Sequence, residues 1–109
     1  MIYEVEVSEQ ADSDLREIFE YIAFELQSPE NAIGQLNRLE EQILSLDAMP
    51  KRYRKYEKEP WKSRELHILP VDNYVMLYIP NSDKKVVTIL RVMYAGRDID
   101  NQLNFHTKQ

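Results

Sequence analysis

The sequence predicts a two-layer α+β fold with the element order β-α-α-β-β-β, in which an N-terminal helical hairpin packs on a mostly antiparallel sheet. The first observation is length, because 109 residues are the usual size of one domain. The second is periodicity: one alternating segment precedes two segments with helical spacing, and three more alternating segments follow. The third is the set of turn residues between the last three segments, which favours a meander that the first strand can join beside the last.

The first strand and the first helix are distinguished by a change of period. Over residues 2–7, Tyr3, Val5 and Val7 alternate with two glutamates, which is the period of a half-buried strand. Ser8 then offers a hydroxyl that suits a helix N-cap. After it, apolar residues recur at helical spacing: Ala11, Leu15, Ile18, Phe19, Ile22 and Leu26.

The second helix is expected to begin at Ser28-Pro29, where a capping residue precedes a proline at the first helical position. Pro50 is expected to stop it. Because the two helices are neighbours in the sequence, we expect them to pack as an antiparallel hairpin. The apolar residues of the second helix step by three or four positions: Ala32, Leu36, Leu39, Ile43 and Leu46.

The second half of the chain is expected to form a basic loop and three strands. The block from Lys51 to Trp61 lacks a clear period and is bounded by prolines, which indicates a loop. Strands are expected over 64–69, 74–79 and 85–95, with turns at 70–73 and 80–83 and Gly96 at the end. We therefore expect a single domain over 1–100 and a polar tail or short helix over 101–109.

Composition excludes several classes of protein. The chain has no Cys and two His, so it has no disulfide or thiolate site, and a zinc centre with three or four ligands is not expected. There is no glycine loop for phosphate either, so we expect neither a metal nor a cofactor. No apolar run approaches the roughly 20 residues that span a bilayer, and the segment MIYEVEVSEQ has neither the basic region nor the apolar region of a signal peptide. We expect a cytoplasmic protein that makes no membrane contact.

Charge is distributed unevenly along the chain. Residues 1–50 carry two basic and twelve acidic side chains, whereas residues 51–64 carry seven basic and two acidic ones. The net charge of −5 is not that of a general nucleic-acid binder, and we expect no sequence-specific DNA binding by the chain alone. Within the basic block, Tyr53 and Tyr56 interleave with the cations, which fits either a stacking and phosphate-binding patch or a solvated loop.

The predicted sheet should leave one face uncovered by the helical hairpin. Strand alternation assigns six residues to the helix side: Leu66, Ile68, Val75, Leu77, Leu90 and Val92. The open face would then present Glu65, His67, Tyr74, Met76, Tyr78, Ile89, Arg91 and Met93. This mixture suits a surface for another chain or a cleft for a polar substrate, and it equally suits an ordinary solvated sheet face.

Several motifs resemble one family when they are taken together and in order. They are the helix DLREIFEYIAFE, Arg64, Asn73-Tyr74, Tyr78, Ile89-Leu90-Arg91-Val92 and Gly96-Arg97-Asp98. In this respect the chain resembles the RelE/ParE superfamily of type II toxin–antitoxin toxins over roughly Met1 to Asp100. The resemblance implies a bacterial toxin that a cognate antitoxin neutralises.

The superfamily has two branches, and the resemblance favours one of them. RelE-like toxins cleave messenger RNA on the ribosome with basic side chains and a C-terminal Tyr or His, whereas ParE-like toxins poison DNA gyrase. Where RelE-like toxins place basic or catalytic residues, this chain has Glu65, His67, Val75 and Leu103. The resemblance therefore implies a ParE-like toxin, with the RelE-like ribonuclease as the alternative.

The resemblance implies two different sets of functional residues. An enzyme would use His67, Arg91, Tyr94 and Arg97 as a diverged ribonuclease site. A binding protein would meet its antitoxin or target through Arg64, Tyr74, Met76, Tyr78 and Arg97. A third alternative is an inactive homologue that binds only its antitoxin.

Overall fold

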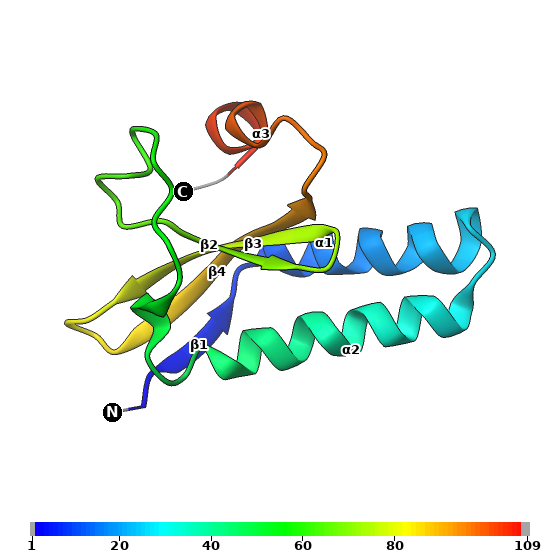
Figure 1. The fold of residues 1–109 in the computed structure, drawn as a ribbon, viewed down its shortest axis with the longest axis horizontal. Coiled ribbons are helices and arrows are strands. Elements are labelled where there is room, and N and C mark those ends of the chain that lie inside the picture. Colours follow the sequence, from blue (N-terminus) through cyan, green and yellow to red (C-terminus); the bar gives the residue numbers. More distant parts are fainter. Residues whose placement is uncertain (1, 108–109) are drawn as a thin grey trace.

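The computed structural model describes residues 2–107 and has a helical hairpin lying along one face of a four-stranded sheet (Figure 1). The strands are β1 (Glu4–Val7), β2 (His67–Val71), β3 (Tyr74–Asn81) and β4 (Val86–Tyr94). The helices are α1 (Glu9–Glu20), the π-helix η1 (Tyr21–Glu25), α2 (Pro29–Ser45), the 3-10 turn η2 (Pro50–Arg52) and α3 (Ile99–His106). This is the α+β class and the element order that the sequence predicts.

The sheet has the strand order β1-β4-β3-β2. Strands β2, β3 and β4 form the antiparallel meander, and β1 pairs with β4 in parallel, from Glu4 opposite Val86 to Val7 opposite Ile89. The expected place of the first strand beside the last is therefore confirmed. Pro70 lies in β2, which tolerates a proline because it is an edge strand.

Ser8 makes the transition from β1 to α1. Its hydroxyl accepts a hydrogen bond from the Ala11 amide, as an N-cap does, and donates to the Leu90 carbonyl of β4. Ser8 therefore begins the helix, and it also supplies a hydrogen-bond donor to the Leu90 carbonyl of β4, just beyond the last residue that pairs with β1.

η1 continues α1, the hairpin turns over residues 26–28, and the second helix begins at Pro29, as expected. Helix α2 ends at Ser45, five residues before Pro50, so the proline does not terminate it. The Arg52 guanidinium instead donates to carbonyls at that helix end, among them Ser45 and Met49.

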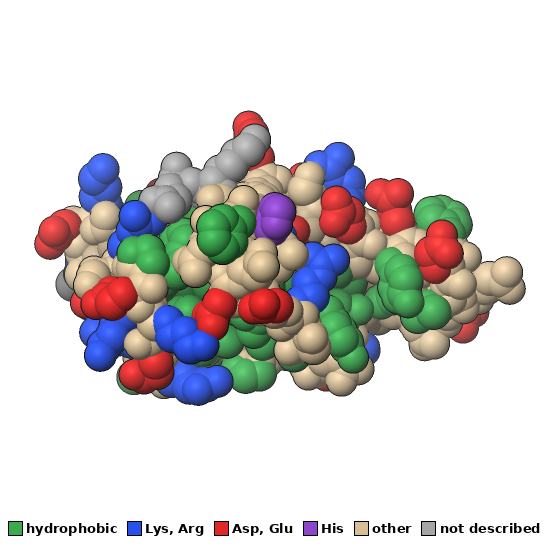
Figure 2. Space-filling model, turned by 90° about the horizontal axis from the view of Figure 1, so that it is seen from above, with side chains coloured by type: hydrophobic (Ala, Val, Ile, Leu, Met, Phe, Trp, Pro, Cys, Tyr) green, Lys and Arg blue, Asp and Glu red, His purple; other side chains and the backbone are tan. Residues whose placement is uncertain are grey.

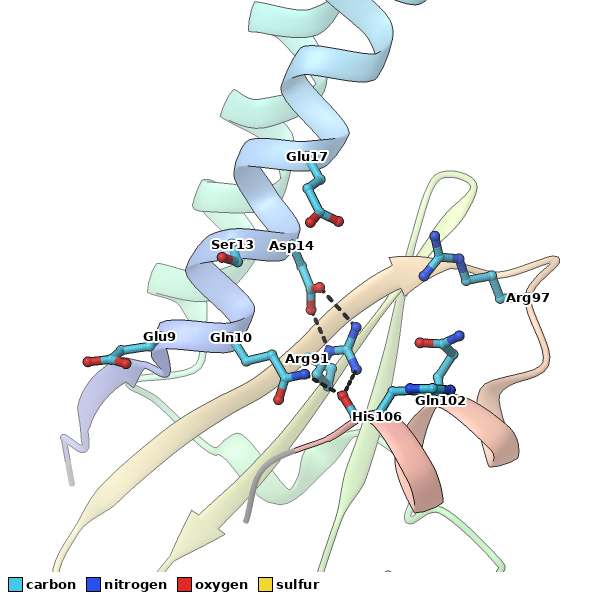
Figure 3. Close-up of a pocket in the computed structure, with 9 residues that line it drawn as sticks. All are labelled: Glu9, Gln10, Ser13, Asp14, Glu17, Arg91, Arg97, Gln102 and His106. Atoms are coloured by element: carbon cyan, nitrogen blue, oxygen red, sulfur yellow. Dashed lines mark hydrogen bonds and ion pairs between the residues drawn. The ribbon is translucent and has the colours of Figure 1, made fainter.

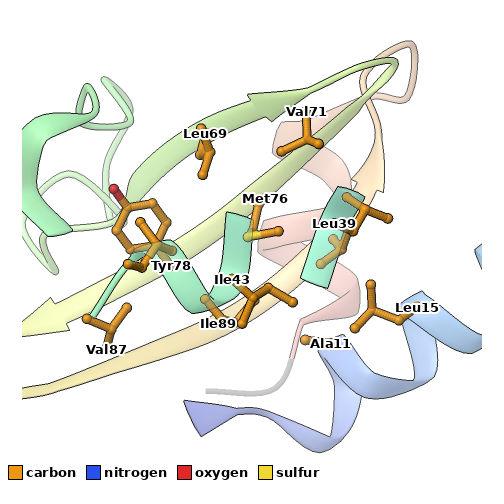
Figure 4. Packing of buried hydrophobic residues seen from close by; sticks show 12 residues of the cluster. Ala11, Leu15, Leu39, Ile43, Leu69, Val71, Met76, Tyr78, Val87 and Ile89 are labelled. Atoms are coloured by element: carbon orange, nitrogen blue, oxygen red, sulfur yellow. The ribbon is translucent and has the colours of Figure 1, made fainter. Parts of the chain in front are cut away.

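The helix-side core is built from the sheet residues that were expected on the open face. Met76, Tyr78 and Ile89 pack against Ala11, Leu15, Leu39 and Ile43, and all three are fully buried (Figure 4). The Tyr78 hydroxyl donates to the Pro50 carbonyl at 2.6 Å. The predicted orientation is therefore wrong for β2, for β3 and for Ile89 and Leu90 of β4, whereas Val92 and Met93 lie on the predicted sides.

The other face of the sheet is covered as well. Ile68, Val75, Leu77, Leu90 and Met93 pack there with Trp61 from the basic loop and Leu103 from α3. Because both faces are apolar, alternation could not tell them apart. A β-bulge opposite Leu77 and Tyr78 adds one residue to β4, so that Ile89 and Val92 share the helix side.

The segment after β4 forms α3 and is fastened to the loop. Asp98 caps the helix by accepting from the Asn101 amide, and the Trp61 indole donates to the Asn104 side chain at 2.9 Å. The basic loop reaches further than expected, because a turn that includes Glu65 at φ 63° delays the start of β2 to His67. Over residues 2–107, no helix has the length and apolar character needed to cross a membrane.

Candidate functional site

A polar pocket of about 490 Å³ lies where α1, β4 and α3 meet (Figure 3). At its base the Asp14 carboxylate forms a two-pronged ion pair with Arg91, with Nε–Oδ2 at 2.7 Å and Nη2–Oδ1 at 3.0 Å. Asp14 also accepts from the Val92 amide at 3.0 Å. The two side chains are 9% and 5% exposed, so this is a buried and fully hydrogen-bonded pair.

Arg91 also holds the C-terminal end of α3. Its Nη1 donates to the His106 carbonyl at 3.0 Å and to the Thr107 hydroxyl at 3.1 Å. Gln10 on α1 donates to the same His106 carbonyl. The Arg91 guanidinium on β4 therefore connects that strand to α1 and to the end of α3, and its hydrogen bonds serve to hold these elements together.

A second hollow, of about 700 Å³, lies between the hairpin and the adjoining ends of β3 and β4. We call it the tyrosine groove, because Tyr21, Tyr74 and Tyr94 line it together with Ile18, Leu26 and Arg97. The rings of Tyr74 and Tyr94 meet edge to face, with centroids 6.0 Å apart and planes at 76°. Burial raises the pKa of Tyr74, and the neighbouring Tyr21 and Tyr94 raise it further.

The Tyr94 side chain is exposed, and its ring packs closely against the backbone at Gly96. A Cβ at position 96 would lie 2.4 Å from the Tyr94 Cε2 atom, which is closer than atoms approach, so the ring occupies the space that Gly96 leaves open. The side chain is 53% exposed. Gly96 and Tyr74 thus position an aromatic ring at the surface.

Arg97 lies on the rim shared by the polar pocket and the tyrosine groove. Its guanidinium points back toward α1, on the side of Glu17 (Figure 3). Over residues 2–107, neither Arg97 nor Glu17 has an ion-pair partner within 4.0 Å. An exposed cation beside an aromatic groove is suited to contact another molecule.

A third hollow, of about 530 Å³, lies on another side of the hairpin, beside β1. We call it the aliphatic groove, because its apolar lining includes Val5, Val7, Leu15, Leu36 and Leu44. β1 is an edge strand, and the side chains of Val7 and Leu44 are exposed.

The basic block is largely used for internal contacts. Lys55 pairs with Glu65 at 2.8 Å and lowers the pKa of that carboxyl, and Lys58 pairs with Asp100. The Arg64 guanidinium lies 5.0 Å from the centre of the Trp61 ring. In Figure 2 basic side chains lie mainly over the end with this loop, while hydrophobic and acidic ones mark the hairpin end.

The structure separates the four residues of the expected ribonuclease set. Arg97 borders both hollows, with Tyr94 in the tyrosine groove and Arg91 in the polar pocket. His67 is only 2% exposed, and its Nδ1 lies 2.8 Å from the Glu65 carbonyl. In the sheet, His67 lies opposite Tyr78 and Tyr94 lies opposite Tyr74. Tyr74 and Tyr78 are four residues apart on β3, so the two pairs are separated by roughly 13 Å along the strand at the usual rise per residue.

The expected binding set is divided in a similar way. Tyr74 and Arg97 share the tyrosine groove, whereas Arg64 lies on the basic loop. Met76 and Tyr78 are fully buried, so the exposure on which their expected binding role rested does not exist. Sequence reasoning missed Tyr21 and Glu17, and it identified Gly96 only as the end of the last strand and part of a family motif. Tyr21 was detectable as an aromatic residue that lies off the apolar stripe of its helix.

No site for a metal ion is apparent in the part of the chain that the structure describes, since no three His, Asp or Glu side chains gather suitably there. No curated protein matches the sequence significantly.

Solved structures share this fold at low sequence identity. A chain of the chromosomal ParDE toxin–antitoxin system of P. aeruginosa superposes with a TM-score of 0.71 at 18% identity, covering 85% of this chain and 96% of that one. The RelBE2 toxin–antitoxin complex of Mycobacterium tuberculosis gives 0.64 at 21% identity, with 86% and 92% covered. A mutant of the E. coli toxin RelE in the free state gives 0.64 at 16% identity, with 91% and 90% covered.

The sequence model of one family matches most of the chain. That family is described as the ParE toxin of the type II toxin–antitoxin system parDE, and the match covers residues 5–99. The match includes α1, the tyrosine groove and all of the sheet except Glu4. The chain therefore belongs to the ParE toxin family of type II toxin–antitoxin systems.

Proposed function

We propose that this toxin acts in the cytoplasm by inhibiting DNA gyrase and that it does not cleave messenger RNA. Family membership supports a ParE-like action. The observation that carries the choice is the state of Arg91 and His67, because the first is held by Asp14 and the second is buried.

Cleavage of RNA needs a cation that stabilises the developing phosphorane and a group that transfers a proton. Arg91 is already neutralised by Asp14 and hydrogen-bonded to α3. Leu103, at the position where the resemblance places a catalytic tyrosine, is a core residue under the sheet. Tyr94 and Arg97 remain near one another at the surface, without His67.

The cognate antitoxin is proposed to bind the aliphatic groove and the free edge of β1. A permanent complex uses a large apolar interface, and this groove combines apolar side chains with the edge of the sheet at β1. Val7 and Leu44 would be contacts of that interface.

Two assays on the purified toxin test this proposal. We expect the toxin to block supercoiling by gyrase in a plasmid assay, and we expect primer extension on a translated message to find no cuts. The toxin premixed with its antitoxin serves as the control. Discrete cleavage at ribosomal A-site codons, with normal supercoiling, would replace the gyrase proposal by the ribonuclease alternative.

A further inference from the structure

The tyrosine groove has the side chains that protein interfaces use most. Tyrosine and arginine are enriched among the residues that dominate binding energy, because each offers a large rigid surface with a polar end. Three tyrosines and Arg97 converge in this groove from three separate parts of the chain: η1, the facing ends of β3 and β4, and the segment that follows β4.

Contacts within the chain orient the Tyr94 ring. Its ring packs edge to face on Tyr74, which is partly buried, and lies over the backbone of Gly96. An exposed aromatic ring that already holds its position loses little conformational freedom when a partner covers it.

Arg97 is the cation of the groove, whose lining also includes Glu17 and the Asp14 that is paired with Arg91. Arg97 has no carboxylate within ion-pair distance over residues 2–107, so its guanidinium is available to an acidic side chain of another molecule. The aliphatic groove differs, since its arginine, Arg16, is already paired with Asp12 at 3.1 Å. Polar and charged surfaces suit a partner that is met transiently, whereas apolar ones suit a permanent partner.

We propose that the tyrosine groove is the surface with which the toxin binds its protein target, with Tyr94 as the aromatic anchor and Arg97 as the contact for an acidic side chain of that target. Gly96 is a positioning residue, because it leaves the space in which the Tyr94 ring lies. This inference rests on the proposed function in that the toxin has a protein target, but it does not depend on that target being gyrase.

The sharpest test is Gly96→Ala. The three atoms nearest the added methyl group all belong to the Tyr94 ring, which can rotate away, so the fold should persist while the ring is displaced. Gly34→Ala is the matched control, because its added Cβ would come within 3.3 Å of only the flexible end of Arg38. Tyr94→Ala and Arg97→Glu remove the two contacts directly, and Phe105→Ala removes an exposed aromatic ring outside the groove.

Each variant is compared in three measurements: growth arrest on induction, copurification with the antitoxin and thermal unfolding. We expect the three groove variants to lose growth arrest by about tenfold or more while antitoxin binding and melting temperature stay unchanged, as expected for truncated interface anchors. Both control variants should arrest growth like the wild type.

Three results would overturn the inference. Groove variants that still arrest growth exclude a target contact, and variants that fold but no longer copurify assign the groove to the antitoxin. A wild-type dimer that the variants dissociate assigns it to a second copy of the chain. A wild-type toxin that arrests growth without inhibiting gyrase would reject the proposed function alone and leave this mapping intact.

Discussion

Two ion pairs of α1 show how burial determines the contribution of an ion pair to the stability of the fold. Asp14 faces Arg91 inside the molecule, whereas Asp12 pairs with Arg16 on the surface, where the two side chains are 64% and 68% exposed. Water screens the second pair, so it contributes little. Asp14 balances a charge that would otherwise be buried alone.

We expect Asp14→Asn to lower the free energy of unfolding by about 3–5 kcal/mol, because it leaves the Arg91 guanidinium buried without a counter-charge. Urea denaturation followed by circular dichroism measures this loss. Asp12→Asn is the matched control on the same helix and should cost about 0.5 kcal/mol or less. Equal costs for the two variants would show that the Arg91 pair has no special role.

Tyr78 combines a buried ring with a hydrogen bond to the Pro50 carbonyl. Burial raises the pKa of Tyr78 well above its ordinary value of 10.0. The hydroxyl therefore remains protonated in the folded chain at pH values where the unfolded chain ionises, and folding is favoured most below the unfolded pKa. As the pH rises above that value, this contribution is lost.

Tyr78→Phe should cost about 1–3 kcal/mol at pH 7, because the Pro50 carbonyl loses its donor. We expect the difference in unfolding free energy between wild type and variant to shrink above about pH 10, where the unfolded wild type gains stability by ionising. Urea titrations at pH 7 and at two alkaline pH values measure the difference. If it stays constant with pH, Tyr78 does not titrate differently in the two states.

Helix α3 is the shortest of the three α-helices and is held by several distinct contacts. Leu103 is fully buried under the sheet with Trp61, and Asn104 accepts from the Trp61 indole. The Asp100 carboxylate accepts hydrogen bonds from the Tyr56 hydroxyl and the Lys58 ammonium group of the basic loop. The loop and α3 therefore stabilise one another across the second face of the sheet.

We expect Leu103→Ala to destabilise the protein by about 2–5 kcal/mol, because it opens a cavity next to Trp61. Phe105→Ala, on the same helix but 77% exposed, should change stability by about 0.5 kcal/mol or less. Tryptophan fluorescence reports on both, since Trp61 is the only tryptophan in the sequence. An unchanged stability of Leu103→Ala would mean that α3 packs only loosely.

The elements were predictable because each has a local signal. Ser8 caps α1 and Pro29 begins α2, as their residue types indicate. The face of the sheet was not predictable in the same way, since Ile89 and Val92 share one side only because of a bulge that alternation does not reveal. In the candidate site, Tyr74, Tyr94 and Arg97 followed from the sequence, but the approach of Tyr21 depends on the path of the hairpin.

The whole molecule has apolar side chains exposed along both sides of its hairpin. Val7 and Leu44 lie at the aliphatic groove, and Tyr21 and Leu26 at the tyrosine groove, while Phe24 is exposed nearby on η1. Soluble monomers rarely leave large apolar patches uncovered unless a partner uses them. The acidic charge of the first fifty residues adds solubility without covering these side chains.

Antitoxin binding should therefore stabilise the toxin strongly. A partner that binds only the folded chain adds about 2.7 kcal/mol at a free concentration one hundred times its Kd. For a domain of this size, that stabilisation should raise the melting temperature by about 10 °C or more. Thermal unfolding at increasing antitoxin concentration measures the rise, which should continue with the logarithm of concentration.

Leu44→Asp should lower the rise by placing a carboxylate in the aliphatic groove, whereas Phe105→Ala should leave it intact. A melting temperature that does not change with antitoxin concentration would show that the folded toxin does not bind it. A rise that Leu44→Asp leaves unaffected would place the antitoxin outside the aliphatic groove.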